Sequence, residues 1–563
     1  MNRITQLTLA ILLLFPFAAM AQSQVTVSGN ITENTTWSAD NEYILDGVVF
    51  VTGGADLTIE PGTVIKAEDG EDLNASALVV TREGRIFAEG TRQNPIIFTS
   101  VLDTGLAMGK NNTGLWGGVV ILGSAPTNNP SDKAVEGINE IADPISLAQY
   151  GGDDPQDTSG VFRYVSIRHT GMNIGSSAGN EIQGLTMGGV GAGTTIEYVE
   201  SFDSADDGFE WFGGTVNTRY LVSAFVEDDG FDTDEGFRGK NQFWFAIQDT
   251  DQAGHMAEQD GSSTDAEDTR PFGYPQIANA TYIGTGNYDN IDNTPEGDPE
   301  ESILLRDNTG VAYYNSVFAD DFKYPFLVAE DVEGNSEFDT RARLEADSVN
   351  FKNSVFANSL ANGSFSALSE LGGDAGYVND MLSDPDNANM VADPMFKGIS
   401  RTANGELDPR PDNDEVLTGA MQFGSEEEFF ENTDYRGAFG DSNWLTGWTA
   451  LSSLGFTAST GTPIQDEGNG VRQELPDRAR LNANYPNPFN PSTQISFSLP
   501  ETREVSITVY DMNGREIAEL VNDSFSAGNH TVTFRANELS SGVYFYKLQT
   551  AGTTDIRKMT LIK

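Results

Sequence analysis

Carboxylate side chains gather most densely between residues 203 and 235. The segment holds Asp203, Asp206, Asp207, Glu210, Glu227, Asp228, Asp229, Asp232, Asp234 and Glu235. Carboxylates at close range repel one another unless protons, basic groups or a hard cation neutralise them, and oxygen-rich sites with several carboxylates suit Ca²⁺. The candidate Ca²⁺ ligands are Asp206, Asp207, Asp228, Asp229, Asp232 and Asp234. The alternative is a row of solvated acidic turns that binds no metal.

Three residues in or beside this cluster are candidate catalytic groups. Arg238 and Lys240 follow it directly and could abstract a proton from a substrate, although both could equally serve as counter-charges to the acids. Glu210 could pair with Asp207 as the acid and base of glycoside hydrolysis, which requires two carboxyl groups. Acidic residues are so abundant here that one such pair is weak evidence for a catalytic role.

Other catalytic signatures are missing from the sequence. The three histidines, His169, His255 and His530, have no zinc-hydrolase spacing, and the chain has no cysteine for disulfides, thiolate metal sites or nucleophiles. No nucleophile elbow or Walker loop occurs. The glycine-rich run at residues 187–193 lacks the helix that a dinucleotide site needs, so we expect no organic cofactor.

The charge balance limits the partners of the 563-residue chain. It has 85 acidic and 32 basic residues, a net charge of −53, which excludes nucleic-acid binding and disfavours anionic lipid. Residues 481–563 hold eight acids and seven bases, so the excess lies before them. We therefore predict a passenger domain at 22–457, a polar linker at 458–480 and a separate domain at 481–563.

The acidic cluster contains a repeat. Residues 198–211 read YVESFDSADDGFEW and residues 220–233 read YLVSAFVEDDGFDT, which aligns Tyr198 with Tyr220 at an offset of 22. A period near 22 fits the coils of a solenoid. Aligned residues of parallel neighbours lie about 4.8 Å apart, so the two Asp-Asp pairs should stack along one edge.

A second repeat supports the solenoid. The run Asn-Ser-Val-Phe occurs at 315–318 and again at 353–356, an offset of 38 that suits one coil with an inserted loop. Equivalent positions would then hold an amide ladder and stacked phenylalanines. Short alternating segments such as 56–60, 77–80 and 95–99 favour β-strands.

The N-terminus has the pattern of an export signal. Arg3 precedes an apolar run over residues 7–17, and Ala19-Met20-Ala21 fits a small-residue cleavage site, which predicts a signal peptide at 1–21. The run is too short for a membrane span, and no later stretch is long enough. We expect a mature protein without a membrane span.

Residues 40–455 also resemble a known group of secreted proteins. The runs LTIEPGTVI at 57–65, PIIFTS at 95–100, WGGV at 116–119, DGFEWFGG at 207–214 and YRGAF at 435–439 are similar to right-handed parallel β-helix proteins of Bacteroidetes-type bacteria. The resemblance implies an all-β solenoid. It implies little about activity.

The last 80 or so residues resemble another family. The runs YPNPFNP at 485–491, VYD at 509–511, SGVY at 541–544 and the terminal Lys558-Met559 are similar to the type A C-terminal sorting domain of the type IX secretion system. This resemblance implies a small antiparallel β-sandwich, recognition by the type IX secretion machinery through residues 481–563, and delivery to the cell surface or the extracellular space.

Two functions follow from these expectations. The first is a non-catalytic surface or secreted protein that serves adhesion, glycan binding or envelope structure and is stabilised by Ca²⁺. The second is a polysaccharide lyase or glycoside hydrolase on the same β-helix, in which Arg238, Lys240 or Glu210 would carry the chemistry. The partner in either case is a polysaccharide or cell-surface glycan.

Overall fold

The structure is a computed structural model, and it divides into two compact units, Met1–Gly461 and Thr462–Lys563. The predicted signal peptide and most of the predicted linker lie outside the described residues. The structure describes residues 23–561 except 71, 130–132, 175–179, 181, 251–253, 262–268, 287–301, 320–326, 329–339, 358–367, 370–375, 425–426, 459–479, 482–491, 500–502, 511, 513–514, 526–527, 537–538 and 551–553.

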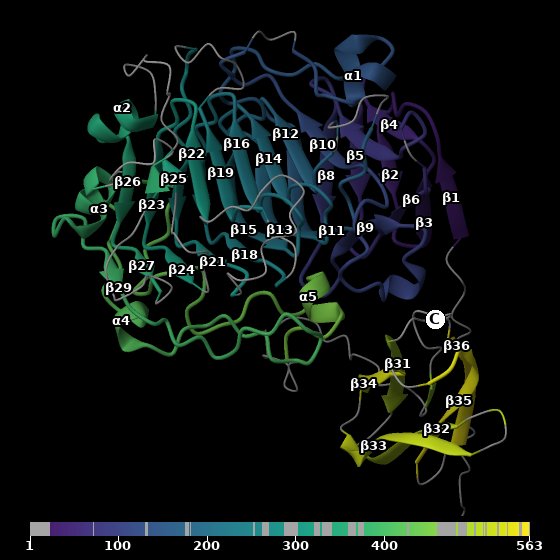
Figure 1. The fold of residues 1–563 in the computed structure, drawn as a ribbon. Coiled ribbons are helices and arrows are strands. Elements are labelled where there is room, and N and C mark those ends of the chain that lie inside the picture. Colours follow the sequence, from purple (N-terminus) through teal and green to yellow (C-terminus); the bar gives the residue numbers. More distant parts are fainter. Residues whose placement is uncertain are drawn as a thin grey trace, which may run out of the picture. The chain divides into compact units, whose positions relative to one another are not determined.

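The first unit is the predicted right-handed parallel β-helix, whose strands stack coil upon coil (Figure 1). Sheet B, one wall of the solenoid, has ten parallel strands among the described residues. They are β4 (Val48–Val51), β7 (Ala77–Val80), β10 (Gly118–Leu122), β12 (Leu185–Gly188), β14 (Phe209–Phe212), β16 (Phe231–Asp234), β19 (Ala257–Asp260), β22 (Ile303–Arg306), β25 (Leu327–Val328) and β28 (Leu368–Ser369).

Sheet A supplies the remaining walls, with nineteen parallel strands in the described part of the chain. They are β1 (Ser23–Val27), β2 (Thr35–Trp37), β3 (Asn41–Leu45), β5 (Asp56–Ile59), β6 (Val64–Ala67), β8 (Arg85–Glu89), β9 (Ile96–Ser100), β11 (Gly160–Arg168), β13 (Thr195–Phe202), β15 (Asn217–Ala224), β17 (Lys240–Gln242), β18 (Phe245–Ile247), β20 (Gln276–Ala278), β21 (Thr281–Ile283), β23 (Val311–Tyr314), β24 (Val317–Ala319), β26 (Val349–Lys352), β27 (Val355–Phe356) and β29 (Met390–Val391).

One corner of the solenoid explains both sequence repeats. The register between β13 and β15 pairs Val199 with Leu221, which confirms the offset of 22. Tyr198 and Tyr220 both have a left-handed backbone, with φ of 55° and 56°, and their rings stack with centroids 4.3 Å apart. A residue in this conformation turns the chain sharply from one wall to the next.

The asparagine repeat occupies the same corner farther along the solenoid. Asn315 and Asn353 have φ of 51° and 55°, and the Asn353 amide donates to Oδ1 of Asn315 at 2.8 Å. Phe318 and Phe356 are paired in register and stack with centroids 5.0 Å apart. The predicted amide ladder and aromatic stack are therefore confirmed.

We expect Asn353→Ala to lower the free energy of unfolding by roughly 1–3 kcal/mol, because the variant removes the buried hydrogen bonds that this amide makes with Asn315, Gly419 and Arg436. Asn111→Ala is the matched control, since Asn111 shares the left-handed backbone, at φ 70°, but is exposed. Urea unfolding of both variants measures the difference. Equal losses would show that the backbone conformation, and not the ladder, sets the effect.

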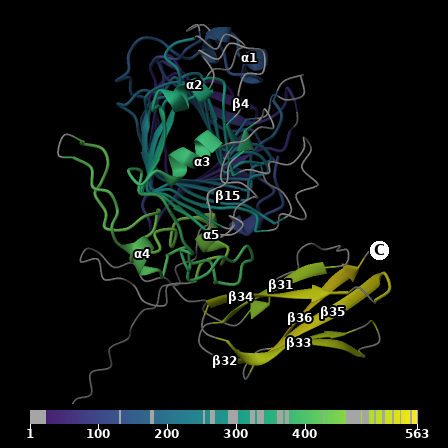
Figure 2. The same ribbon diagram turned by 60° about the vertical axis from the view of Figure 1, so that its left-hand side comes forward.

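Aromatic and aliphatic side chains fill the interior of the coils. Phe209, Trp211 and Phe231 are fully buried in one continuous core. The helix α3 (Gly376–Ser383) packs Val378 and Leu382 onto this core, and Figure 2 shows α3 at an open end of the solenoid. The other helices are short: η1 (Thr104–Leu106), α1 (Ile138–Ile141), η2 (Ile145–Leu147), α2 (Thr340–Glu345), α4 (Asp414–Leu417) and α5 (Ala450–Ser453).

Residues 396–457 form a C-terminal strap that runs back along the solenoid. At one end the Arg436 side chain donates to the carbonyl oxygen of Asn353 at 2.9 Å, and at the other the Arg92 side chain donates to the carbonyl oxygen of Thr446 at 2.8 Å. The buried carboxylate of Glu200 accepts the first backbone N–H groups of α5, from Ala450 at 2.5 Å and Leu451 at 3.2 Å. The strap thus ties early coils to late ones.

The second unit is the predicted antiparallel β-sandwich, with a hydrophobic core of its own. One sheet has the order β30-β31-β34 and the other β33-β32-β35-β36. Their bounds are β30 (Arg480–Leu481), β31 (Ser492–Leu499), β32 (Arg503–Tyr510), β33 (Glu516–Phe525), β34 (Gly528–Arg535), β35 (Gly542–Gln549) and β36 (Thr554–Leu561). Within the described parts of both units, no helix has the length and apolar character to cross a membrane.

Candidate functional site

The outer face of sheet B carries a row of carboxylates across three coils. The register pairs Phe209 with Phe231 and Glu210 with Asp232, and it pairs Asp232 with Glu258 on the next strand. Successive side chains of a strand point to opposite faces. Because Phe209 and Phe231 lie in the core, Glu210, Asp232 and Glu258 lie on the outside, one above another.

A second outward row follows two residues along the same strands. Asp234 and Asp260 end β16 and β19, and Asp260 is paired in register with Arg306 of β22. The Arg306 guanidinium lies 2.8 Å from Oδ1 of Asp260 and 2.5 Å from Oε1 of Glu258. Arg306 therefore forms ion pairs with the last carboxylate of each row.

The two Asp-Asp pairs precede these strands and stack as predicted. Oδ1 of Asp207 accepts the backbone N–H of Asp229 at 3.0 Å, and Asp206, Asp207 and Asp228 each place one carboxylate oxygen within 4.8 Å of the others. Asp207 and Asp229 are buried, whereas Asp228 is exposed. We call the stacked pairs and the two outward rows the acidic ladder. Its members are Asp206, Asp207, Glu210, Asp228, Asp229, Asp232, Asp234, Glu258 and Asp260.

The ladder has a central group of three converging carboxylates. Asp207, Glu210 and Asp232 each offer an oxygen within 4.8 Å of the other two. Glu210 is 8% exposed, and its Oε2 is buried without a hydrogen-bond partner; Oδ1 of Asp232 is buried and unpartnered too. A buried carboxylate oxygen with no partner costs several kcal/mol relative to one in water. A positive ligand at this point would relieve that cost.

Burial and mutual repulsion shift five carboxyls of the ladder toward their protonated form. Burial first, and then the neighbouring carboxylates, hold the pKa of Asp207, Glu210 and Asp232 well above the usual range. The pKa of Asp234 and of Glu258 is raised for the same two reasons. Only protonation or a bound cation relieves such a cost in the folded state.

Sheet A shows how this protein arranges outward charges that satisfy one another. Arg163, Glu197 and Arg219 occupy one outward row on β11, β13 and β15. The guanidinium of Arg163 lies 3.0 Å from the Glu197 carboxylate, and that of Arg219 lies 4.0 Å from it on the other side. The signs alternate there, whereas Glu210, Asp232 and Glu258 repeat one sign. Glu210 and Asp232 thus lack the alternating partners that balance the charges on sheet A.

The proposed catalytic bases do not face the ladder. Lys240 lies on β17 of sheet A, and its ammonium binds the Glu427 carboxylate at 2.6 Å. The Arg238 guanidinium donates to the carbonyl oxygen of Phe272 at 2.9 Å and lies over the rings of Phe272 and Tyr274. Proximity in sequence was misleading here, because the chain turns from sheet B to sheet A between Asp234 and Lys240. The counter-charges of the ladder are instead supplied from elsewhere.

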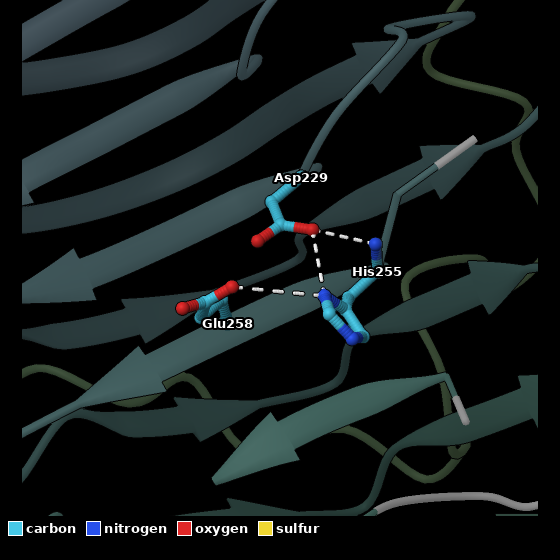
Figure 3. A group of neighbouring side chains, drawn as sticks. All are labelled: Asp229, His255 and Glu258. Carbon is cyan, nitrogen blue, oxygen red and sulfur yellow. Dashed lines mark hydrogen bonds and ion pairs between the residues drawn. The ribbon is translucent and has the colours of Figure 1, made fainter. Parts of the chain in front are cut away.

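One residue that contacts the ladder is His255, which sequence analysis left out of the site. Its Nδ1 lies 3.0 Å from Oδ1 of Asp229 and 3.7 Å from Oε2 of Glu258 (Figure 3). Burial acts to raise the pKa of Asp229, but the charge and hydrogen bonds of His255 outweigh it and lower the pKa. The alternation Ala-Glu-Gln-Asp at 257–260, which matches Phe-Asp-Thr-Asp at 231–234, was the signal that could have placed Glu258 and Asp260 in the ladder.

Glu235 follows the second row and has partners from a distant insertion. Its carboxylate accepts the Tyr150 hydroxyl at 3.0 Å and binds the Lys133 ammonium. Both partners lie between β10 and β11, where Tyr150 also packs on Phe212 of β14. Tyr150 and Lys133 therefore satisfy and neutralise Glu235, although they lie more than 80 residues away from it in sequence.

We expect the metal-free protein to lose stability between pH 5 and pH 8. Six ladder carboxyls have a folded-state pKa above the unfolded value: Asp207, Glu210, Asp232, Asp234, Glu258 and Asp260. Their stabilising protonation is complete below about pH 4 and is lost as the pH rises through the raised values, about 6 for Asp260. Thermal unfolding across this range measures the trend, and Glu210→Gln should flatten it. A melting temperature that rises from pH 5 to pH 8 would contradict the burial of these carboxyls.

Comparisons with known proteins match both units of the chain. Residues 29–382 match the family model described as a pectate-lyase like beta helix domain, and residues 483–563 match the secretion system C-terminal sorting domain. No curated protein matches the chain. Among solved structures, the enzymatically active domain of tailspike protein 2 from bacteriophage CBA120 is 10% identical, with a TM-score of 0.20, and the match covers 92% of this chain and 72% of that one.

Proposed function

The chain belongs to the family of pectate-lyase-like β-helix domains and carries a type IX sorting domain that directs it to the cell surface or the extracellular space, and from this premise we propose that it is a calcium-bound, glycan-binding protein. The proposal assigns the ladder a binding role and not a catalytic one. Export places the ladder outside the cell, where a hard divalent cation and carbohydrate would be its ligands.

The observation that carries the proposal is the unpartnered, buried carboxylate oxygen of Glu210 between Asp207 and Asp232. Ca²⁺ binds oxygen at 2.3–2.6 Å, so oxygens on opposite sides of one ion lie about 4.8 Å apart. The three carboxylates therefore span a distance that a single Ca²⁺ could bridge. Asp206 and Asp228 offer further oxygens beside Asp207.

A bound Ca²⁺ would also give the ladder its affinity for glycan. The ion takes six to eight oxygen ligands, and the three carboxylates of Asp207, Glu210 and Asp232 leave some of these positions open. Hydroxyl or carboxylate oxygens of a sugar chain are suitable ligands for them. The net charge of −53 would otherwise repel an acidic glycan, so calcium is expected to be required for its binding.

One observation favours the alternative of a lyase or hydrolase. The raised pKa of Glu210 is what a general acid needs, and Asp207 lies beside it. The proton-abstracting role has less support. Arg238 and Lys240 face away from the ladder. Burial acts to lower the pKa of Arg306, but the carboxylates of Asp260 and Glu258 outweigh it and raise the pKa, so Arg306 stays protonated and cannot abstract a proton.

The test is a polysaccharide panel assayed for binding and for cleavage, with the full mature chain in Ca²⁺ and in chelator. We expect Ca²⁺-dependent retention of at least one glycan class without new reducing ends or unsaturated products, and loss of retention in Glu210→Gln. Cleavage that Glu210→Gln abolishes would establish the enzyme alternative. Binding that is unchanged in chelator would contradict the role of calcium.

A further inference from the structure

His255 occupies a position in which its imidazole and two carboxylates meet at one point. Nδ1 of His255 lies 3.0 Å from Oδ1 of Asp229 and 3.7 Å from Oε2 of Glu258, and each of the three residues offers one ligand atom within 4.8 Å of the other two. Figure 3 shows Asp229 meeting His255 and Glu258, which come from a second segment at the start of β19. We propose that Asp229, His255 and Glu258 form a second cation site, selective for a divalent ion that accepts imidazole, such as Zn²⁺.

The separations suit ligands around one ion. With metal–ligand bonds of about 2.0–2.1 Å, neighbouring ligand atoms of a tetrahedral zinc site lie about 3.3 Å apart. The observed separations of 3.0 Å and 3.7 Å fall on either side of that value. The third separation, between the two carboxylates, is within 4.8 Å, so all three residues lie close enough to share one ion.

The carboxylates of this site are already held in place by other groups. Oδ1 of Asp229 accepts the backbone N–H of His255 at 2.5 Å. Oε1 of Glu258 is bound by Arg306 at 2.5 Å, so Oε2 is the atom directed at the imidazole. Outer contacts of this kind orient metal ligands and raise the affinity of a site.

The donor set separates this site from the group proposed to bind Ca²⁺. Asp207, Glu210 and Asp232 offer only carboxylate oxygens, which suit a hard cation, whereas the site at His255 adds a nitrogen, which suits Zn²⁺. Three protein ligands leave a tetrahedral ion one open position for water or for a group from outside. The inference does not rest on the calcium proposal, because the two sites use different side chains.

The experiment is a calorimetric titration of Zn²⁺ into the full mature chain, stripped of metal and held in excess Ca²⁺ so that the hard-cation sites are filled. We expect one Zn²⁺ per chain and a loss of affinity of roughly 100-fold or more in His255→Gln. His530→Gln, in the sorting domain, is the matched control and should bind like the parent. Equal affinity in all three proteins would overturn the assignment, as would the absence of Zn²⁺ binding.

A second measurement keeps the test valid if His255→Gln misfolds. X-ray absorption of Zn²⁺ bound to the parent chain should show one imidazole and otherwise oxygen ligands. An all-oxygen shell would exclude His255 and overturn the proposal. Glu210→Gln separates the two proposals: it should weaken Ca²⁺ binding and leave Zn²⁺ binding intact, so failure of one site is distinguishable from failure of the other.

Discussion

Deletion of residues 481–563 is expected to abolish delivery of the β-helix to the cell surface or the medium and to leave it in the periplasm. The deletion removes the whole second unit, whose match to the secretion system C-terminal sorting domain spans residues 483–563. The β-helix itself should still fold, because its core and the strap lie within Met1–Gly461. The expected effect is nearly complete loss of the extracellular protein.

Cell fractionation with an antibody against the β-helix measures this effect. A shorter deletion of the polar segment 462–479 is the control, because it keeps the sandwich strands and should preserve export. Extracellular display of the chain that lacks 481–563 would show that the tail is an ordinary β-sandwich module. Retention of the control in the periplasm would show instead that the linker is required.

Removal of divalent cations is expected to lower the melting temperature of the protein at neutral pH by several degrees, with full recovery on return of Ca²⁺. A ligand that binds only the folded state stabilises it by about 2.7 kcal/mol at a concentration 100 times its Kd. At neutral pH, protonation of the buried carboxyls is a costly substitute for the ion. On unfolding these carboxyls regain their ordinary pKa and lose their protons, which favours the unfolded state. Differential scanning calorimetry in chelator and in Ca²⁺ provides the measurement.

Two variants that each remove one carboxylate should differ in their response to Ca²⁺. Glu210→Gln removes a buried, unpartnered carboxylate, so in chelator it should melt at or above the temperature of the parent, yet it should gain less from Ca²⁺. Glu197→Gln removes an outward carboxylate that is already paired on sheet A, and its effect should be below about 1 kcal/mol and independent of Ca²⁺. A parent that melts identically in chelator and Ca²⁺ would defeat the calcium proposal.

Most of the β-helix fold could be predicted from local repeats in the sequence. The offset of 22 between Tyr198 and Tyr220 fixes the register of two coils, since parallel strands of a solenoid place equivalent residues side by side. The asparagine repeat at 315 and 353 belongs to the same corner, which sequence comparison alone did not reveal. Tyrosine and asparagine have no local pattern in common that would place them at the same corner. Only the left-handed backbone that both adopt shows that the positions are equivalent.

The site was only partly predictable, for two physical reasons. The Asp-Asp pairs were found because they repeat with the coil, and Asp207 and Asp232 do converge with Glu210. His255 and Glu258 belong to a coil whose spacing from its neighbour is 26 residues and not 22, so the repeat fails there. The strap was beyond local patterns, because Glu200 meets Ala450 across 250 residues.

The position of Arg238 and Lys240 away from the ladder has the same origin. A β-helix brings together residues one coil apart and separates residues a few positions apart on either side of a corner. Asp234 ends a strand of sheet B, and Lys240 begins one of sheet A, so six residues suffice to leave the site. In this fold, sequence neighbours are poorer candidates for a shared site than residues one coil away.

The central claim is that the ladder binds Ca²⁺ through Asp207, Glu210 and Asp232, and calorimetric titration of Ca²⁺ into the metal-free mature chain tests it most directly. The prediction is saturable binding with at least one ion per chain, weakened roughly tenfold or more in Glu210→Gln and unchanged in Glu197→Gln. Absence of saturable binding in the parent, or equal binding in the two variants, would contradict it.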